Sequence, residues 1–418
     1  MLTPLIAMKR SAVFRPELAL YYSPLIRLGG AERQWAEELR AFRAAGVQAI
    51  GLTQAASPNI LSQLSLEREA VRILAATRPW ARAQRLRQWL VRNRPRLLVA
   101  HSSPELTFLA TLGTAVPYVL YQSSPPFYGG YSSNPYPHAL RHRTAYRRLS
   151  VRTPGYLQFG RLPNGLRPLG RCKLEVRAFV KTLAMRRAAA VVVLSTRAAR
   201  EIQALYGVRA TSVRGCLDEA VATYVPSLDV RARHGLADRP LLVSVCRLEA
   251  VKRVDLLLRA FAEVRRGCPR AMLVVGGSGS EAERLDALAR ELGIRRDVVF
   301  TGFIPNEEVW DYFAAADVFV APATADFNIA PYEALALGRK VVLSDELELE
   351  EWIAASGWVF RVPATVEAFS RAIQDALIAP HPAPLDLSTL TWSARVNSLL
   401  GCFQEAVGRH APALMAAS

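Results

Sequence analysis

The chain has 418 residues, 51% of them hydrophobic, which is enough for two domains of roughly 200 residues each with a sizeable core. Its net charge of +17 is uneven, with +22 on residues 1–224 and −5 on residues 225–418. These values exclude a small disulfide-bonded scaffold and favour an anionic partner for the first half: anionic lipid head groups, a lipid-linked diphosphate or nucleic acid. A solvated arginine-rich face with no partner is the alternative.

The cysteines and the apolar runs further limit the kinds of protein that this chain can be. The five cysteines form no CxxC pair, so neither a zinc site nor a disulfide framework is expected, and a reducing compartment fits. The first ten residues do not resemble a signal peptide, because their apolar stretch is short and the positive charges follow it. No apolar run approaches the ~18 residues needed to cross a bilayer. We therefore expect a cytoplasmic protein, either soluble or peripheral on the inner face of the membrane.

The first predicted elements form a βαβ unit. Strands are expected over residues 18–22 and 47–52, with a helix between them that opens at Gly29 and Gly30 and ends near Ala45. Glycine at such a turn lets the backbone approach a phosphate closely. A bare Gly-Gly pair is more often only a tight turn, so both readings stay open.

Residues 66–94 are predicted to be largely helical and strongly basic. A basic amphipathic segment can lie on an anionic membrane surface. It can equally be an ordinary surface helix whose leucine and tryptophan side chains face the core. The sequence leaves these two interpretations open.

Buried strands are expected over residues 97–100 and 118–121, with their carboxyl ends at one edge of a sheet. His101 and Ser123 follow these strands, so both are candidate residues of a cleft, with a structural role as the alternative for His101. Residues 127–174 are irregular and rich in Tyr and Arg, which suits a polar, ring-containing acceptor such as a glycan. Partial disorder is the alternative there.

The rest of the chain continues to alternate strands and helices. Helices are expected over 176–187, from an N-cap at Ser195 or Thr196 to 206, and over 254–265, 281–292, 307–315, 347–355 and 392–407. Strands are expected over 189–194, 241–246, 271–275, 298–300, 318–321 and 341–344, after a linker over 224–240. This alternation predicts two doubly wound, Rossmann-like α/β domains around a cleft, over 1–224 and 225–390, followed by a segment over 391–418.

Arg247 and Lys252 bracket the turn from the strand over 241–246 to the next helix. Two cations beside a helix N-terminus predict a diphosphate site, and a basic surface turn is the less favoured alternative.

Residues 317–339 read as strand, polar loop and helix, with Pro331 in the first helical turn and Gly338 just past the end. The free N–H groups at the start of this helix suit a phosphate or a sugar hydroxyl. Glu333, placed in the first turn, can accept hydrogen bonds from a diol. The alternative is an ordinary strand–loop–helix with Glu333 at the surface.

Residues 317–339 also resemble the signature of the retaining nucleotide-sugar glycosyltransferases of family 4, which have the GT-B fold. The residues that match in order are Asp326, Phe327, Ile329, Pro331, Glu333, Ala334 and Gly338. Arg247, Leu248 and Lys252 resemble a second family pattern, and Gly29-Gly30-Ala31-Glu32-Arg33 a third. Ala325 stands where the family has a first Glu, Ser123 where it has a His, and Asn328 where it has a Gly.

The resemblance implies a role for each matching position. Glu333 would bind the ribose of the donor, and Arg247 and Lys252 would neutralise the leaving nucleoside diphosphate. Other donor contacts would come from Gly29, Gly30, Gly302 beside the base, Asp326, Asn328, and the amides of Ile329 and Ala330. The C-terminal helix would cross back to the N-terminal domain.

The implied activity is that of a retaining hexosyltransferase without metal or cofactor. It would move a sugar from a GDP- or UDP-sugar to a glycan or lipid-linked acceptor, as in bacterial surface polysaccharide or lipopolysaccharide synthesis. A non-catalytic donor-binding or scaffold subunit is the alternative, because Ala325, Ser123 and Asn328 depart from the family. A nucleic-acid binder is a third hypothesis, but no nucleic-acid motif supports it, so no such partner is expected.

Overall fold

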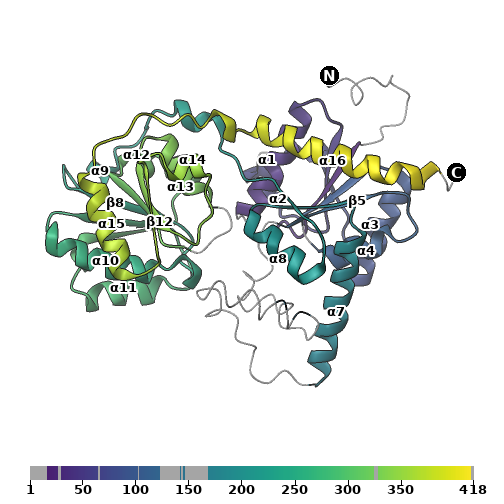
Figure 1. Ribbon diagram of the computed structural model, residues 1–418, viewed down its shortest axis with the longest axis horizontal. Helices are drawn as coiled ribbons and strands as arrows, with labels where there is room; N and C mark the ends of the chain where they lie inside the picture. Colours follow the sequence, from purple (N-terminus) through teal and green to yellow (C-terminus); the bar gives the residue numbers. More distant parts are fainter. Residues whose placement is uncertain are drawn as a thin grey trace. The chain divides into compact units, whose positions relative to one another are not determined.

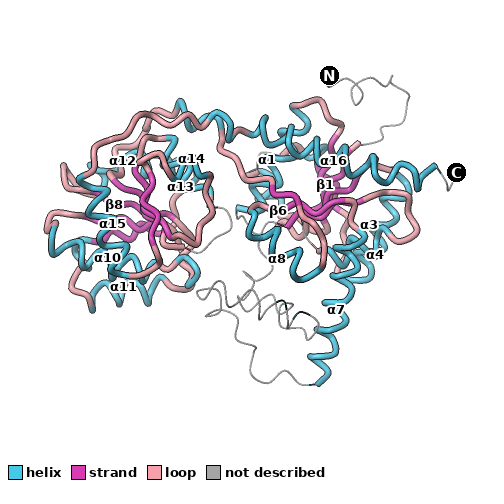
Figure 2. The backbone as a smooth tube through the Cα atoms, in the orientation of Figure 1, coloured by secondary structure: helices cyan, strands magenta, loops and turns pink. Residues whose placement is uncertain are grey.

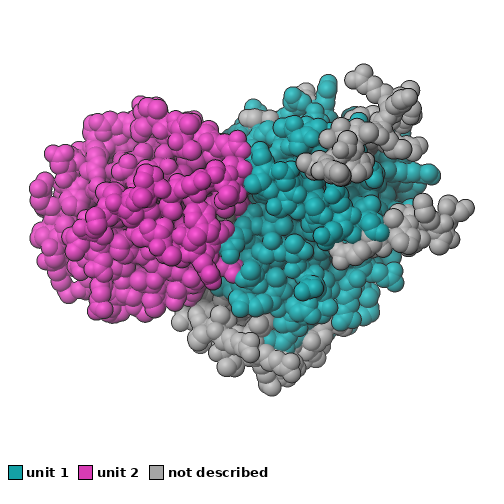
Figure 3. Space-filling model, turned by 45° about the horizontal axis from the view of Figure 1, so that its top comes forward, with its two compact units in different colours: residues 1–214, 392–418 teal, residues 215–391 magenta. Residues whose placement is uncertain are grey.

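The computed structural model describes residues 17–26, 30–64, 66–101, 103–122, 168–323 and 328–415, together with positions 142 and 145. The chain divides into two compact units, residues 1–214 with 392–418 and residues 215–391 (Figure 3). Of the predicted site residues, Gly29, Ser123 and Asp326 lie outside the described residues. So does most of the irregular stretch, except that residues 168–174 belong to a helix.

The first unit is built on a parallel sheet with helices on both faces (Figure 1). The strands run in the order β3-β2-β1-β4-β5-β6-β7: β1 (Leu18–Tyr21), β2 (Ala49–Thr53), β3 (Val71–Ile73), β4 (Leu97–Ala100), β5 (Tyr118–Gln122), β6 (Ala190–Val193) and β7 (Thr211–Ser212). The helices are α1 (Gly30–Ala44), α2 (Pro58–Gln63), α3 (Pro79–Asn93), α4 (Pro104–Thr111), α7 (Pro168–Arg187), α8 (Thr196–Tyr206) and α16 (Trp392–Met415).

The second unit repeats this plan with a six-stranded parallel sheet, whose strands lie at its centre in Figure 2. The strand order is β10-β9-β8-β11-β12-β13: β8 (Leu241–Val245), β9 (Met272–Gly276), β10 (Val298–Gly302), β11 (Val318–Ala321), β12 (Lys340–Ser344) and β13 (Val359–Val362). The helices are α9 (Val230–Arg233), α10 (Val254–Gly267), α11 (Ala282–Glu291), α12 (Asn306–Ala315), α13 (Ile329–Ala336), α14 (Glu351–Ala354) and α15 (Val366–Ile378).

Local sequence explains these elements. The central strands are continuous apolar runs because a parallel sheet between two helical layers is buried on both faces. On β8, Leu242 faces one apolar cluster and Val243 faces the other. The helices present one apolar stripe, and Ser195 caps α8 by accepting a 2.9 Å hydrogen bond from the Ala198 amide. The predicted N-cap is thereby confirmed at Ser195.

Two predicted boundaries are wrong. Residues 66–94 are not one helix, because β3 pairs with β2 at the sheet edge and α3 begins only at Pro79. Proline disfavours the helical conformation in the residue before it, and Arg78 is extended. The helix predicted over 347–355 is limited to α14, and the strand β13 and helix α15 follow it unpredicted.

The predicted return of the C-terminal helix to the first unit is confirmed. Helix α16 packs against α1, with the rings of Phe42 and Phe403 5.9 Å apart. Figure 1 shows α16 running along the face of the sheet that α1 covers. The first unit is therefore assembled from both ends of the chain.

Candidate functional site

The strand order of the second unit places a topological switch point between β8 and β11. Strands β9 and β10 continue from β8 in one direction, whereas β11, β12 and β13 continue in the other. In open parallel sheets, ligands bind outside the carboxyl ends of the strands at such a point. The loop after β8 carries Arg247 and Lys252, and the loop after β11 leads to Asn328 and α13. The two predicted site stretches therefore share one edge of the sheet.

The β8 loop presents one exposed and one partly buried cation. Arg247 has a side chain that is 71% exposed, and its Nη1 lies 3.6 Å from Oε1 of Glu249. Lys252 ends a short 3-10 turn over Ala250–Lys252 and is partly buried. Burial lowers the pKa of Lys252, and the positive charge of Arg247 lowers it further. A bound anion would oppose both effects by favouring the charged amine.

Glycines in the next loop hold the β8 loop in position. Gly277 has φ of +125°, and a Cβ there would lie 1.8 Å from the Cys246 carbonyl oxygen. A Cβ on Gly279 would lie 2.2 Å from the Leu248 carbonyl oxygen. The Leu248 amide donates to the Ser278 carbonyl at 2.9 Å. These glycines serve the close approach of two backbones, which fixes the loop that carries Arg247.

Arg253 occupies the position where the family pattern has a glycine, and its backbone is left-handed, with φ of +49°. A non-glycine residue rarely adopts this conformation. The Arg253 guanidinium forms an ion pair with Glu346 at 3.1 Å, which links the start of α10 to the carboxyl end of β12. Its partner Glu346 carries no sequence signal that could have predicted this ion pair.

Helix α13 starts at Ile329, so Pro331 lies in its first turn, as predicted. Asn328 is its N-cap residue and makes no side-chain capping hydrogen bond. Ile329 and Ala330 are the first two helical residues, so their amides are among those without an intrahelical partner. Pro331 is the third residue and Glu333 the fifth. The prediction that Glu333 lies in the first turn is therefore wrong.

Glu333 is held by a neighbouring helix. The Trp310 Nε1–H on α12 donates to Glu333 Oε1 at 3.0 Å. The Tyr224 ring packs edge-on against Trp310, with centroids 5.2 Å apart. At the end of β10, Gly302 has φ of +69° and open space around it, and the adjacent Phe303 is 69% exposed. Neither Trp310 nor Phe303 was singled out from the sequence as a site residue.

In the first unit, Gly30 is the first residue of α1, directly after the segment that follows β1. The Tyr22 hydroxyl donates to Glu32 Oε1 at 2.8 Å, so the first turn of α1 is tied to the carboxyl end of β1. The switch point of this sheet lies between β1 and β4. Gly30 and His101 both follow strands that border it.

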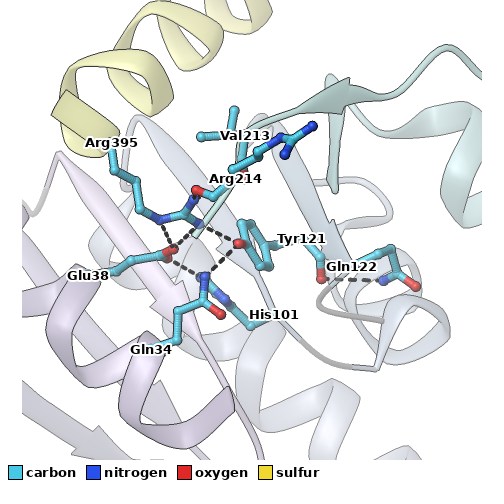
Figure 4. A network of polar contacts seen from close by, with 8 residues as sticks. All are labelled: Gln34, Glu38, His101, Tyr121, Gln122, Val213, Arg214 and Arg395. Atoms are coloured by element: carbon cyan, nitrogen blue, oxygen red, sulfur yellow. Dashed lines mark hydrogen bonds and ion pairs between the residues drawn. The ribbon is translucent and has the colours of Figure 1, made fainter. Parts of the chain in front are cut away.

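His101 belongs to a buried polar network (Figure 4). Its Nε2 lies 3.1 Å from Oε2 of Glu38, and its ring stacks on Tyr121 at 4.4 Å. Arg395 of α16 binds Oε1 of Glu38 at 2.6 Å and donates to the Val213 carbonyl at 2.9 Å. The side chain of His101 is 3% exposed, so it presents little surface to a ligand. Its assignment as a site residue stays a prediction.

The network sets the charge of Glu38. Burial alone would raise the pKa of this carboxyl, but the attraction of His101 and Arg395 lowers it below its ordinary value. Gln34 and Arg395 both donate to the Tyr121 hydroxyl. Within the described residues, no three His, Cys, Asp or Glu side chains gather closely enough to hold a metal ion. None of the described helices is long and apolar enough to span a membrane.

Comparison with known protein families identifies both halves of the chain. Residues 29–214 match the Glycosyl transferase 4-like domain, and residues 228–387 match Glycosyl transferases group 1. The fold resembles that of sucrose-phosphate synthase from Thermosynechococcus elongatus, with a TM-score of 0.64 and 19% identity over 97% of this chain and 100% of that one. It also resembles Anabaena HepE in complex with UDP, with a TM-score of 0.63 and 17% identity over 96% and 99% of the two chains.

Two relatives are similar in sequence over part of their length. The GDP-mannose-dependent alpha-(1-6)-phosphatidylinositol monomannoside mannosyltransferase of Mycolicibacterium smegmatis is 35% identical over 38% of this chain and 45% of its own. The alpha-D-kanosaminyltransferase of Streptomyces kanamyceticus is 28% identical over 53% and 62%. The matches therefore span about half the length of these relatives. The two family matches and the two parallel-sheet units show that the chain belongs to the family 4 glycosyltransferases with the GT-B fold.

Proposed function

We propose that this glycosyltransferase moves a sugar, with retention of configuration and without a metal ion, from a nucleoside diphosphate to a glycan or lipid-linked acceptor. The observation that carries the proposal is the shared sheet edge of the second unit, where Arg247, Lys252 and the start of α13 flank the switch point. This unit would bind the donor, and the first unit the acceptor.

The chemistry needs a site for charge that develops during transfer. The bond between the sugar C1 and the phosphate oxygen breaks, and its electron pair leaves with the diphosphate. The acceptor hydroxyl oxygen bonds to C1, and its proton passes to an oxygen of the departing diphosphate. Arg247, Lys252 and the amides of Ile329 and Ala330 would stabilise the departing diphosphate. Two cations and a helix start at this position support transfer without a metal ion.

Charge and relatives support the choice of partners. HepE is described in complex with UDP and the mycobacterial relative is named for GDP-mannose, so we propose a UDP- or GDP-sugar as donor. The charge of +22 on residues 1–224 supports an anionic, lipid-linked acceptor. Such an acceptor would place the enzyme peripherally on the inner face of the cytoplasmic membrane, in surface polysaccharide or lipopolysaccharide synthesis.

The test compares the wild type with Glu333→Ala for binding and hydrolysis of UDP- and GDP-sugars. Turnover of one donor, weakened in Glu333→Ala but unchanged in the exposed control Glu283→Ala, is the expected result. Activity should also persist in the presence of a chelator. Failure to bind any nucleotide would refute the proposal.

The second candidate is a donor-binding subunit without turnover. Ala325 favours it, because the family has there a Glu that contacts the donor sugar. Nucleotide binding that depends on Glu333, with no turnover even on lipid-linked acceptors, would support this candidate. Activity that appears only in Ala325→Glu would show that the missing carboxylate is the cause.

A further inference from the structure

Helix α3 exposes arginines that form no ion pair with any described residue. Residues 70–104 contain eight arginines and no Asp or Glu. Those exposed on α3 and its two flanking residues are Arg78, Arg85, Arg87, Arg92 and Arg94. Within the described part of the chain, none of these five forms an ion pair. A local field of one sign therefore covers this helix.

Surface arginines of the second unit behave differently. Arg266 pairs with Glu263 at 2.6 Å, one turn away on the same helix. Arg284 pairs with Glu281 in the same manner at 2.5 Å, and Arg290 pairs with Asp286. A solvated helix face usually mixes both signs in this way. The lack of acids on α3 is therefore a feature of that surface and not of the whole protein.

Large apolar side chains stand among these cations. Trp80 is 63% exposed and Val91 50% exposed. Positions 80, 84, 87 and 91 fall on one stripe of the helix because they are spaced by four, three and four residues. Trp80, Arg87 and Val91 therefore point to the same side, about 100° around the helix from the buried Leu86 and Leu90. Arg85 and Arg92 lie about 120° further round, at the other edge of the exposed half of the helix.

Helix α4 extends the apolar surface. It packs beside α3, as Figure 1 shows, and it exposes Leu109 (47%) and Leu112 (41%). Arg87 donates to the Leu112 carbonyl, so the two helices are joined at this point. Cations and apolar side chains thus occur together on one surface of adjacent helices.

We propose that this surface, the α3–α4 face, docks on an anionic lipid bilayer. The face consists of Trp80, Arg87, Val91, Leu109 and Leu112 at its centre, with Arg85 and Arg92 flanking them on the exposed half of α3. Arginines bind anionic head groups, while tryptophan and aliphatic side chains enter the boundary between head groups and acyl chains. A nucleic acid would use the same cations but would leave the aliphatic side chains in water. The inference deepens the membrane contact proposed above by naming the surface.

The first experiment measures co-sedimentation of the full chain with vesicles. Phosphatidylcholine vesicles are compared with vesicles that also contain phosphatidylglycerol. Each arginine at the surface contributes about fivefold, so Arg85→Gln with Arg92→Gln should weaken binding to the anionic vesicles by roughly 25-fold. Arg266→Gln with Arg290→Gln makes the same change in net charge on the second unit, and should change binding by less than about twofold.

The second experiment tests entry of the apolar side chains. Brominated lipids quench tryptophan that reaches the acyl boundary. Trp80→Phe should remove most of the quenching, whereas Trp352→Phe, at an exposed tryptophan of α14 (44%), should leave it unchanged. Equal quenching in the wild type and Trp80→Phe would overturn the proposed orientation.

Three results would overturn the docking proposal itself. The first is that the wild type does not bind anionic vesicles, and the second is that the two double arginine variants lose vesicle binding equally. The third is that the protein binds a single-stranded oligonucleotide more tightly than anionic vesicles at the same salt concentration. Nucleotide binding in solution separates this proposal from the proposed function. It should be unchanged in the α3 variants, and its absence in the wild type would count against the transferase and not against docking.

Discussion

The indole N–H of Trp310 donates to Oε1 of Glu333 at 3.0 Å, so a side chain on α12 fixes the direction of the carboxylate on α13. The Tyr224 ring makes an edge-on contact with the indole, and its hydroxyl donates to Asp311 Oδ1 at 2.9 Å. A carboxylate held in one direction can accept two hydroxyl hydrogens of a ribose without first losing rotamer freedom. Trp310 is therefore a positioning residue for the proposed donor site.

This arrangement predicts a change in nucleotide preference. Glu333→Gln should lose roughly tenfold or more of the preference for UDP or GDP over the 2′-deoxy nucleotide, because a charge-assisted hydrogen bond is lost. Trp310→Phe keeps the ring but removes the donor, and should lose a smaller part of the same preference. Calorimetric titration with both nucleotides measures it, with Trp352→Phe as control. An unchanged preference in Glu333→Gln would rule out ribose binding at this residue.

Arg253 has a strained backbone and also forms an ion pair. Two substitutions separate the effects of these features on stability. Arg253→Ala keeps φ near +49° and loses the pair with Glu346, so it should destabilise the protein more than Arg253→Gly, by about 1 kcal/mol. The difference is measured by urea denaturation. Ala237, which has φ of +46° and is exposed, is the matched control: Ala237→Gly should stabilise by up to about 1 kcal/mol. Arg253→Ala and Arg253→Gly with equal stability would contradict the strain.

The pair of Glu38 and Arg395 predicts a stability that depends on pH. Arg395→Met should destabilise the first unit by about 3–5 kcal/mol, because it leaves a buried carboxylate without its cation. The folded pKa of Glu38 is lowered from 4.5, so the stability it contributes is present above that value and is lost as the pH falls through the folded pKa.

Glu38→Gln should remove this acid-dependent part, and Glu38→Gln with Arg395→Met should recover some of the loss seen in Arg395→Met alone. Thermal unfolding between pH 7 and pH 3 measures both effects, with the exposed Arg266→Met as control. Loss of stability in acid that is the same in Glu38→Gln and the wild type would assign the effect to other carboxylates.

The surroundings of Cys246 predict that its thiol is alkylated slowly, although two cations lie nearby. Burial raises its pKa to about 11, and the nearby Lys252 and Arg247 only partly oppose this. At pH 8 about one thiol in a thousand would be ionised, so alkylation by iodoacetamide should be slow and should speed up with pH towards 11. Cys172 is exposed and serves as the internal control in the same mass-spectrometric experiment. Equal rates for the two thiols at pH 8 would show that the pKa of Cys246 is not raised.

Local patterns were enough to bring the residues of the proposed donor site to one sheet edge, because each motif is short and follows its own strand. Arg247 and Lys252 follow one strand, and Glu333 follows another, so the alternation of strands and helices was enough to bring them to one sheet edge. The predicted boundaries of helices and strands were wrong where an arginine-rich composition was given more weight than the local signals. The arginine-rich residues 66–94 hid the edge strand β3, although Pro79 marked the true start of α3.

Contacts between distant residues could not be predicted. Glu38 and Arg395 are 357 positions apart, and neither stands out in its own helix. Trp310 likewise lies on α12 with no motif around it, and its role depends on how α12 packs against α13. Such pairs depend on tertiary packing, which a periodicity in sequence does not specify.

The discontinuous first unit has a consequence for synthesis on the ribosome. Its sheet is encoded before residue 215, but its Glu38 carboxylate meets Arg395 only after the whole second unit has been translated. The second unit is contiguous, and all six of its strands precede residue 363. We therefore expect the second unit to finish folding first, because the first unit cannot be completed until α16 has been synthesised. A chain stopped at Thr391 should accordingly hold a protease-resistant second unit beside a protease-sensitive first one.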